Sequence, residues 1–361
     1  MQGAEWFATA PGGLSRYFGE LYAALRRRPD LEVSASAFGD PPAGGQSWGP
    51  AGGSTLRRVR ASRREPPPAD AIVDRHFCLY GRSAPGKRTG RGGLVVHFHG
   101  PWAAESAFTG DGLLSVAAKH RIERLRYAGA DRIVVLSDFF RKRLIDDYRI
   151  DDRVIRVIPG GVSVDSFHAL GEHRAAGGDG EPAERPVVLC VRRLEKRMGI
   201  DVLLQAWPGV LAARPDAQLV IVGSGSQDSV LRGLAELNGL RRSVTFTGRL
   251  SDAALAEQYR SAAVTVVPSM ALEGFGLIAL ESLAAGRAPV VTDCGGLPET
   301  VRGLDPSLII PAANPDALAA RLAGALAGMV PAPMLCRRHA ETFGWAEVAR
   351  RHAELYAELA P

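Results

Sequence analysis

The stretch VTVVPSMALEGFGLIALE, residues 264–281, joins a β-branched apolar run to a Glu-Gly-Phe-Gly turn that opens a helix. Such a turn exposes free backbone N–H groups at the positive end of a helix dipole, where a phosphate binds favourably. Glu273 and Glu281 are eight positions apart, which corresponds to about 12 Å if both lie along one helix. The stretch therefore predicts a strand–turn–helix unit that holds an anion between two carboxylates.

This spacing fits a nucleoside diphosphate sugar laid across the start of the helix. The backbone amides would bind the diphosphate, Glu273 would hold the hexose, and Glu281 would accept hydrogen bonds from the ribose hydroxyls. The alternative is a surface helix that carries two glutamates, one of them near its N-terminus, where a carboxylate is mildly stabilising. The stretch by itself leaves both interpretations open.

On either side of this stretch, short apolar runs alternate with longer helical patterns, which is typical of parallel α/β units. In the second half the predicted strands are 187–191, 219–222, 244–247, 264–268 and 289–292, and the helices are 200–213, 229–237, 252–261 and 277–285. This order indicates a doubly wound sheet. In the first half we expect strands at 94–98, 133–136 and 154–158, and helices at 14–28 and 139–147. The turn at Pro11-Gly12-Gly13 leaves little room for a full strand before it.

Residues 168–186 are rich in Gly, Ala, Pro and charge without an apolar period, so they predict a linker. We therefore expect one domain at 1–167, a second at 187–340, and an amphipathic C-terminal helix within 341–361. The 361 residues, 46% hydrophobic and 23% charged, are enough for two cores. This balance excludes a disordered tail, a fibre and a small disulfide-stapled scaffold.

Composition also limits the compartment and the partners. No run of about 18 apolar residues and no signal-peptide layout occurs, so a cytoplasmic protein is expected. Four scattered cysteines without a CxxC pair predict free thiols. Net charge +5 fits an anionic ligand, but scattered arginines and the lack of a recognised module argue against nucleic acid. Peripheral contact with the inner membrane face stays open because of a basic cluster at Arg57, Arg58, Arg60, Arg63 and Arg64.

Further motifs occur in order along nearly the whole chain: Gly12-Gly13-Leu14-Ser15-Arg16-Tyr17-Phe18, His97-Phe98-His99-Gly100, Val135-Leu136-Ser137-Asp138, Val157-Ile158-Pro159-Gly160-Gly161-Val162 and Gly295-Gly296-Leu297-Pro298-Glu299. With Glu273-x7-Glu281 they resemble retaining glycosyltransferase family 4, the relatives of glycogen synthase and sucrose synthase. The resemblance implies an α/β GT-B architecture, in which two Rossmann-like doubly wound domains face each other across a cleft and the C-terminal helix crosses back to the first. It also implies a nucleotide-sugar donor bound mainly by the second domain and an acceptor bound mainly by the first.

The resemblance also assigns roles to residues. It makes His99 and Glu273 catalytic, with His99 contacting the sugar or the attacking hydroxyl. No metal and no further cofactor are expected, because positive side chains and helix dipoles neutralise the departing diphosphate. The donor-binding residues that it implies are Gly12, Gly13, Arg193, Lys196, Arg197, Leu250, Gly274, Phe275, Gly276, Leu277 and Glu281.

Two positions depart from the family pattern. The family more often has glycine where Arg192 stands and lysine where Met198 stands. Either Lys196 or Arg197 would then supply the second positive charge beside Arg193. The segment Gly223-Ser224-Gly225 lacks the third glycine of a dinucleotide-binding fingerprint, which disfavours an NAD enzyme.

The sequence thus predicts a retaining, metal-independent hexosyltransferase that uses a UDP- or GDP-linked sugar and a hydroxyl acceptor, in natural-product or cell-surface glycan biosynthesis. Trp102 and Glu105, just after His99, predict contacts to a small-molecule or glycan acceptor such as a sugar, an aminocyclitol or a natural-product scaffold. Trp102 could equally be a core residue. A GT-B sugar-nucleotide epimerase, a phosphorylase and a noncatalytic nucleotide-sugar-binding protein are the alternatives.

Overall fold

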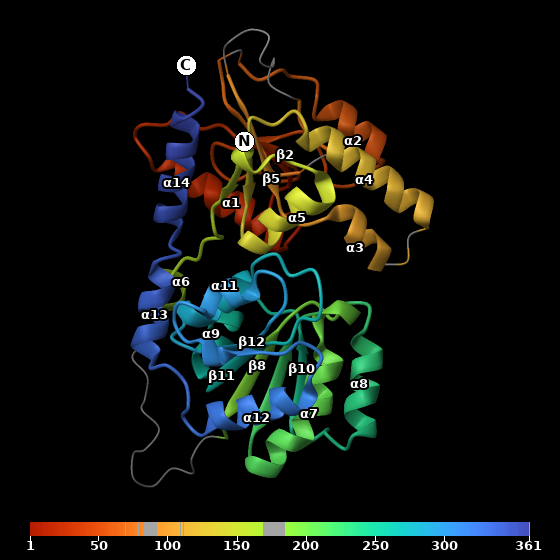
Figure 1. Ribbon diagram of the computed structural model, residues 1–361, viewed down its shortest axis with the longest axis vertical. Helices are drawn as coiled ribbons and strands as arrows, with labels where there is room; N and C mark the ends of the chain where they lie inside the picture. The colour runs from red at the N-terminus through yellow and green to blue at the C-terminus, as the bar shows by residue number, and fades with distance from the viewer. Residues whose placement is uncertain are drawn as a thin grey trace. The chain divides into compact units, whose positions relative to one another are not determined.

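The computed structural model describes residues 1–68, 70–77, 79–82, 92–108, 110, 112–168 and 185–360, and the chain forms two compact units (Figure 1). The first unit comprises Met1–Gly161 and Trp345–Pro361, and the second comprises Val162–Gly344. The first boundary precedes the expected residue 167 because helix α6 (Asp165–His168) packs against α9 and α10 of the second unit. Residues 169–184 of the predicted linker lie outside the described residues.

The first unit is built on a parallel sheet of seven strands in the order β3-β2-β1-β4-β5-β6-β7. Its strands are β1 (Gln2–Glu5), β2 (Ser36–Phe38), β3 (Gln46–Ser47), β4 (Val73–Arg75), β5 (Leu94–Phe98), β6 (Arg132–Val135) and β7 (Ile155–Val157). The segment before the first glycine turn, where the sequence leaves little room for a full strand, holds the short strand β1. Strand β1 pairs with both β2 and β4. The ring of Phe18 packs directly against Gly3, since a β-carbon at this position would lie only 2.6 Å from the ring.

The helices of the first unit are α1 (Gly13–Arg26), α2 (Thr55–Ala61), α3 (Trp102–Phe108), α4 (Leu113–Tyr127), α5 (Asp138–Tyr148) and α14 (Trp345–Ala357). A core joins β5 and β6 to α5 through Phe98, Ile133, Val135, Phe140 and Leu144. A short 3-10 turn at Asp152–Val154 leads into β7. The predicted strands and helices of this half are present: the strand at 94–98 has the predicted boundaries, and the others are shifted by one or two residues.

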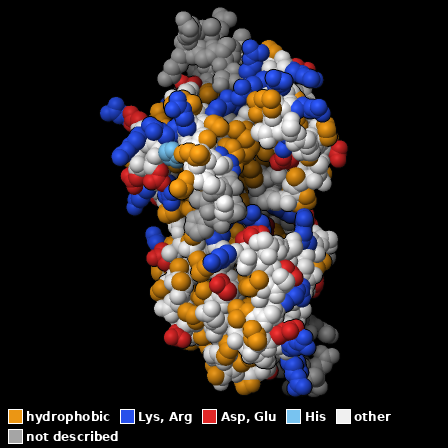
Figure 2. All heavy atoms as spheres, turned by 90° about the vertical axis from the view of Figure 1, so that its right-hand side faces the viewer, with side chains coloured by type: hydrophobic (Ala, Val, Ile, Leu, Met, Phe, Trp, Pro, Cys, Tyr) orange, Lys and Arg blue, Asp and Glu red, His pale blue; other side chains and the backbone are white. Residues whose placement is uncertain are grey.

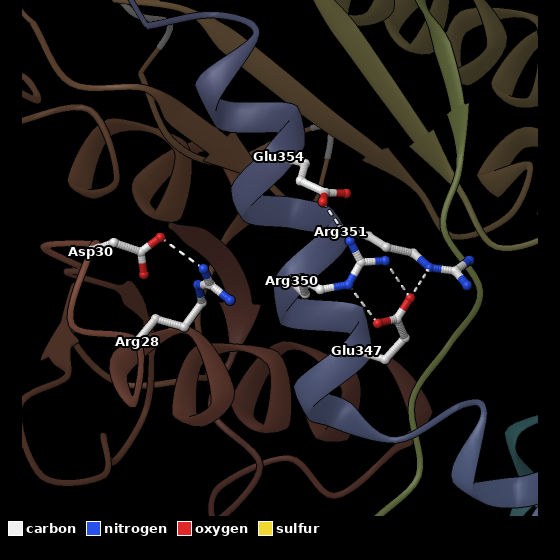
Figure 3. Close-up of polar contacts among 6 residues, drawn as sticks. All are labelled: Arg28, Asp30, Glu347, Arg350, Arg351 and Glu354. Carbon is white, nitrogen blue, oxygen red and sulfur yellow. Dashed lines mark hydrogen bonds and ion pairs between the residues drawn. The ribbon is translucent and has the colours of Figure 1, made fainter.

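Helix α14 is the amphipathic terminal helix that the sequence predicts, and it lies beside α1 (Figure 1). Its inner face buries Trp345, Val348, His352 and Leu355. The outer face carries ion pairs among Glu347, Arg350, Arg351 and Glu354, and a separate pair joins Arg28 to Asp30 (Figure 3). Each of these partly exposed pairs contributes at most about 1 kcal/mol, so the buried face is what holds the helix in place.

The second unit contains a parallel sheet of six strands in the order β10-β9-β8-β11-β12-β13. Its strands are β8 (Val187–Val191), β9 (Gln218–Val222), β10 (Val244–Gly248), β11 (Val264–Val267), β12 (Pro289–Thr292) and β13 (Ile309–Ile310). Its helices, besides α6, are α7 (Ile200–Ala213), α8 (Asp228–Leu237), α9 (Asp252–Ser261), α10 (Leu277–Ala284), α11 (Leu297–Val301), α12 (Pro315–Leu326) and α13 (Pro333–Glu341), with 3-10 turns at Lys196–Met198 and Pro306–Leu308. Both faces of this sheet are buried, and its strands are accordingly nearly continuous runs of apolar residues.

In both sheets the strand order reverses at one point, between β1 and β4 in the first and between β8 and β11 in the second. Doubly wound sheets bind ligands outside the carboxyl ends of the strands at such a point. His76 follows β4 in the first unit, whereas Arg192 follows β8 and Ser269 follows β11 in the second. The topology therefore indicates a candidate ligand site at the reversal point of each sheet.

Among the described residues, no helix has both the length and the apolar character needed to cross a bilayer. Cys190, Cys294 and Cys336 are buried free thiols, as the sequence predicts. Cys78 lies outside the described residues.

Candidate active site

The second unit holds a buried ion pair at its strand-order reversal. Arg192, directly after β8, donates hydrogen bonds from its guanidinium to the hydroxyl of Ser269 and to the carboxylate of Glu273. The Ser269 hydroxyl donates in turn to Glu273 Oε2 at 3.0 Å. The side chain of Arg192 is 5% exposed and that of Glu273 is 14% exposed. The arginine that departs from the family pattern therefore fixes the first predicted carboxylate.

These contacts decide the protonation state of Glu273. Burial alone would raise the pKa of its carboxyl group, but the charge of Arg192 and the hydrogen bonds from Arg192 and Ser269 lower that pKa below its usual value. Glu273 is therefore ionised at neutral pH. An ionised carboxylate can only accept hydrogen bonds, so Glu273 can hold hydroxyls or face a developing positive charge.

Glu273 lies in a loop and not on the following helix. Helix α10 begins at Leu277 with Gly276 as its N-cap, so the separation of about 12 Å calculated from one helical rise does not apply to Glu273 and Glu281. At Gly276 φ is 93°, and a β-carbon would lie 2.3 Å from Leu297 Cδ2. Glycine is required there by both backbone conformation and space.

The Gly295-Gly296 motif fixes the backbone of the same loop. The N–H of Gly296 donates to the carbonyl of Glu273 at 2.9 Å. At Gly295 φ is 61°, and a β-carbon would lie 2.0 Å from that carbonyl oxygen. Two motifs that are separate in the sequence are thus hydrogen-bonded to each other at Glu273. Gly274 belongs to this loop.

Glu281 lies on α10, and its carboxylate accepts a hydrogen bond from the Tyr259 hydroxyl at 3.0 Å. Burial first, and then the charge of Glu281, raise the pKa of Tyr259 well above its usual value. Tyr259 is therefore a permanent donor at neutral pH and orients one carboxylate oxygen of Glu281.

The predicted cations differ in their surroundings. Arg193 and Lys196 are exposed. Arg197 is half-buried, and its Nη1 lies 3.3 Å from the carbonyl oxygen of Leu272 and 3.5 Å from that of Ala271. Of the two candidates for the second positive charge, Arg197 lies beside the Glu273 loop.

The structure also shows the surroundings of the three apolar residues that were predicted for the donor site. The ring of Phe275 is 2% exposed and lies 5.8 Å from that of Phe343, so this residue can offer only backbone groups to a ligand. Leu277 begins α10 and is partly buried. Leu250 packs against a buried cluster that contains Val222.

In the first unit, the ends of β4 and β5 bring three histidines together. His76 Nδ1 lies 3.3 Å from His99 Nε2. The carboxylate oxygen Oδ1 of Asp74 lies 3.0 Å from His97 Nε2 and 3.5 Å from His76 Nε2. The other carboxylate oxygen accepts a hydrogen bond from Tyr356 on α14. We call Asp74, His76, His97 and His99 the histidine cluster.

The histidine cluster contains uncharged imidazoles around one carboxylate. Burial lowers the pKa of His97 to about 4 and lowers those of His76 and His99, well below the usual value for His99. Burial would raise the pKa of Asp74, but His97 and His76 lower it well below its usual value. The cluster therefore packs uncharged, stacked rings around an ionised Asp74.

Nitrogen atoms of His76, His97 and His99 lie within 4.8 Å of one another, so their metal-binding capacity needs testing against ring geometry. The three rings are inclined by only 17–23°, and the centroids of His76 and His97 are stacked 3.8 Å apart. Imidazole binds a metal along an in-plane lone pair. The stacked rings of His76 and His97 keep their lone pairs in separate, nearly parallel planes and so cannot both direct one at the same ion, and His76 Nδ1 faces His99 Nε2 instead. The arrangement therefore fits a polar network better than a metal centre.

The remaining predictions for the first unit have less distinctive surroundings. Gly12 is the extended N-cap of α1, and a β-carbon at Gly12 or Gly13 would meet nothing within 4 Å. Trp102 begins α3 and packs against the core, which supports its core interpretation. Its backbone N–H donates to Glu123 Oε1 at 2.8 Å. Glu105, one turn along α3, is partly buried.

Sequence reasoning did not assign a function to Asp74, His76, Ser269 or Tyr356. Asp74 and His76 alternate along an extended segment, as His97 and His99 do, and this period of two places each pair on one side of its strand. That shared alternation is the signal from which the histidine cluster could have been found. The contact between Arg192 and Glu273 left no comparable pattern in the sequence.

Two family models match this chain, one in each half. "Glycosyltransferase Family 4" matches residues 11–166, and "Glycosyl transferases group 1" matches residues 176–338. A phosphatidyl-myo-inositol mannosyltransferase of Mycobacterium tuberculosis is 36% identical over 56% of this chain and 54% of its own length. This chain thus spans about half the length of that relative.

A D-inositol 3-phosphate glycosyltransferase of Segniliparus rotundus is 28% identical over 94% of this chain and 82% of its own length. The crystal structure of Anabaena HepE in complex with UDP and glucose is 16% identical, covers 99% of both chains and has a TM-score of 0.72, which shows a shared fold. The two parallel sheets, the ordered motifs and the two family models lead to one assignment. The chain belongs to glycosyltransferase family 4 and has the GT-B fold.

Proposed function

We propose that this protein transfers a hexose from a nucleoside diphosphate sugar to a hydroxyl group, with retention of anomeric configuration and without a metal. The observation that carries the proposal is the ionised Glu273, held by Arg192 and Ser269 at the strand-order reversal and directly before α10. A fixed carboxylate directly before a helix N-terminus supports binding of a sugar linked to a diphosphate.

The donor would lie over the start of α10. Its diphosphate would accept hydrogen bonds from the first amides of that helix and face Arg193 and Arg197. Glu281, oriented by Tyr259, would accept hydrogen bonds from the ribose hydroxyls. The proposal is supported by the UDP and glucose in the HepE structure, which has the same fold.

In the transfer step the bond between the anomeric carbon and the diphosphate oxygen breaks, and the acceptor oxygen bonds to that carbon on the same face. The departing phosphate oxygen takes the proton of the acceptor hydroxyl. Glu273 stabilises the positive charge that develops on the sugar, and the cations and helix amides stabilise the diphosphate. His99, as a neutral imidazole, accepts a hydrogen bond from a substrate hydroxyl.

The acceptor is proposed to be a polyhydroxylated small molecule or glycan. Both curated relatives described above carry inositol in their names, which supports a cyclitol or sugar hydroxyl as the point of attachment. Trp102 packs into the core, so Glu105 is the stronger candidate of the two for an acceptor contact.

We further propose that the first unit contacts an anionic membrane surface. On α4, Leu113, Leu114 and Leu125 are exposed by 89%, 89% and 68%, and the exposed Arg121 and Arg124 line a surface cavity of about 710 Å³. Exposed basic and hydrophobic side chains are interspersed over this unit in Figure 2. Such a mixture suits anionic lipid headgroups. We expect the protein to sediment with phosphatidylglycerol vesicles but not with phosphatidylcholine vesicles. Binding to neither kind of vesicle, or equal binding to both, would overturn the proposed membrane contact.

The first test is calorimetric titration with UDP, GDP, ADP and dTDP, each with and without Mg²⁺. Micromolar binding of one nucleotide without Mg²⁺ is expected, and it would identify the donor base. Failure of all four to bind would contradict the proposed donor site.

A second test separates transfer from the alternatives. Incubation with the sugars of that base and a panel of cyclitol and sugar acceptors should release nucleoside diphosphate only when an acceptor is present. NMR of the product should show the anomeric configuration of the donor. Sugar epimerisation without nucleotide release, or binding without any turnover, would favour the epimerase or the noncatalytic alternative.

A further inference from the structure

The histidine cluster contains enough contacts to determine which ring nitrogen of His99 carries its proton. Neutral imidazole has one protonated nitrogen and one with a lone pair, and neighbouring groups select between these tautomers. In this cluster Asp74 is the starting point, because an ionised carboxylate accepts hydrogen bonds and donates none.

The nitrogens that face Asp74 carry protons. His97 Nε2 and His76 Nε2 lie 3.0 and 3.5 Å from Asp74 Oδ1 without the alignment of a hydrogen bond, but at such distances the negative charge of the carboxylate favours a proton over a lone pair on the facing nitrogen. Tyr356 occupies the other oxygen of Asp74, so both histidines compete for Oδ1. Since His76 is neutral, its Nδ1 then carries the lone pair.

The contact between His76 and His99 then determines which nitrogen of His99 is protonated. His76 Nδ1 lies 3.3 Å from His99 Nε2, and two lone pairs cannot face each other at that distance without repulsion. His99 Nε2 must therefore carry the proton and donate to His76 Nδ1. Neutral His99 consequently keeps its own lone pair on Nδ1.

We propose that His76 is a positioning residue that fixes His99 as the Nε2–H tautomer, so that His99 accepts a hydrogen bond from a substrate hydroxyl through Nδ1. His99 is partly exposed, whereas Asp74, His76 and His97 are buried. Tyr17 packs edge-on against His99 with ring centroids 5.0 Å apart and restricts its rotation. The chain of contacts Asp74–His76–His99 thus presents one acceptor nitrogen from an otherwise buried network.

The tautomer itself follows from contacts in the first unit, but its use on a substrate hydroxyl rests on the proposed function. The test therefore has two separate measurements. The first is NMR of protein labelled with ¹⁵N-histidine, because protonated and unprotonated ring nitrogens have widely different ¹⁵N shifts. His99 is assigned from the signal that is missing in His99→Gln.

The decisive variants are His76→Asn and His76→Phe. Asparagine keeps an acceptor oxygen near the position of Nδ1, whereas phenylalanine keeps the ring volume without any acceptor. The wild type and His76→Asn should show His99 with a protonated Nε2, and His76→Phe should lose that preference. His352→Gln is the matched control, because His352 is equally buried and stacks on His97, with ring centroids 5.3 Å apart.

A wild-type His99 that is protonated on Nδ1 or populates both tautomers equally would overturn the proposal. So would an unchanged His99 tautomer in folded His76→Phe. If His76→Phe does not fold, the wild-type spectrum and Asp74→Asn, which removes the starting charge and should mix the tautomers, decide the matter.

The second measurement is turnover. His76→Phe should lower kcat by about tenfold, the equivalent of one hydrogen bond, with an unchanged Kd for the nucleotide, and His76→Asn should restore most of it. Equal loss of kcat in both variants would overturn the positioning role. A protein with the predicted tautomer but no transfer activity with any donor would instead contradict the proposed function.

Discussion

Tyr356 and Asp74 are 282 positions apart in the chain, and the hydroxyl of Tyr356 donates a hydrogen bond to the carboxylate of Asp74. Tyr356 comes from α14 and Asp74 from β4, so this contact attaches the terminal helix to the central strands of the first sheet. The same carboxylate faces His97 and His76. A packing contact of the last helix is therefore also part of the histidine cluster.

Removing the Tyr356 hydroxyl should measure this attachment. Tyr356→Phe leaves one oxygen of a buried carboxylate without its donor, and we expect the free energy of unfolding in urea to fall by about 1–3 kcal/mol. Tyr22→Phe is the matched control, since the buried Tyr22 hydroxyl has no hydrogen-bond partner among the described residues. A loss in Tyr356→Phe no larger than that in Tyr22→Phe would contradict the interpretation.

Stability should decrease as the solution becomes acidic. Burial lowers the pKa of both His97 and His352 to about 4, whereas an unfolded histidine titrates near 6.5. The unfolded state therefore binds more protons between these values, and each histidine lowers the free energy of unfolding by up to about 1.4 kcal/mol per pH unit as pH falls from about 6.5 to about 4.

Urea unfolding at intervals between pH 7 and pH 4.5 checks this expectation. His352→Gln removes one of the buried histidines with a lowered pKa and should flatten the pH dependence by about one proton. A wild-type stability that is constant across this range would contradict the lowered pKa values of His97 and His352 in the folded state.

Separating the ion pair of the second unit should be costly. Arg192→Met leaves the buried carboxylate of Glu273 without its counter-charge, and a loss of about 3–5 kcal/mol is expected for a broken buried pair. Arg193→Met is the control, because Arg193 is the next residue and is exposed; its effect should stay within about 0.5 kcal/mol. Thermal and urea unfolding give both values, and equal effects would refute a structural role for Arg192.

Nucleotide binding should depend on Glu281. Glu281→Ala removes the acceptor that Tyr259 orients, and we expect the donor nucleotide to bind more weakly by about 1–3 kcal/mol. Tyr259→Phe should weaken binding less, because the carboxylate remains. Calorimetry with the nucleotide that binds the wild type measures both, and an unchanged Kd in Glu281→Ala would remove Glu281 from the donor site.

The sequence predicted the second unit better than the first for a physical reason. Strands β8, β9, β11 and β12 are buried on both faces and therefore form continuous apolar runs. Strand β4 reads Val-Asp-Arg, yet all three residues are buried. A buried aspartate is tolerated there only because His97 and Tyr356 surround it, and neither neighbour is visible from the local sequence.

In the candidate site, too, the sequence motifs point to individual residues but do not show which residues contact each other. The motifs predicted Glu273, Glu281 and His99 as site residues, and the departure at Arg192 was visible from the sequence. Its contact with Glu273 was not visible, because the two residues are 81 positions apart and meet only through the pairing of β8 with β11. The sequence shows which residues carry a charge, but the partner of each charged residue can be known only when the order of the strands in the sheet is known.

The path of the chain also has a consequence for synthesis. The first unit ends with Trp345–Pro361, after all of Val162–Gly344 has formed the second unit. On the ribosome, the second unit can therefore complete its core while the first still lacks α14. Until that helix emerges, Asp74 lacks its contact with Tyr356, so a nascent chain that stalls before α14 has emerged would carry a finished second unit and an unfinished first one.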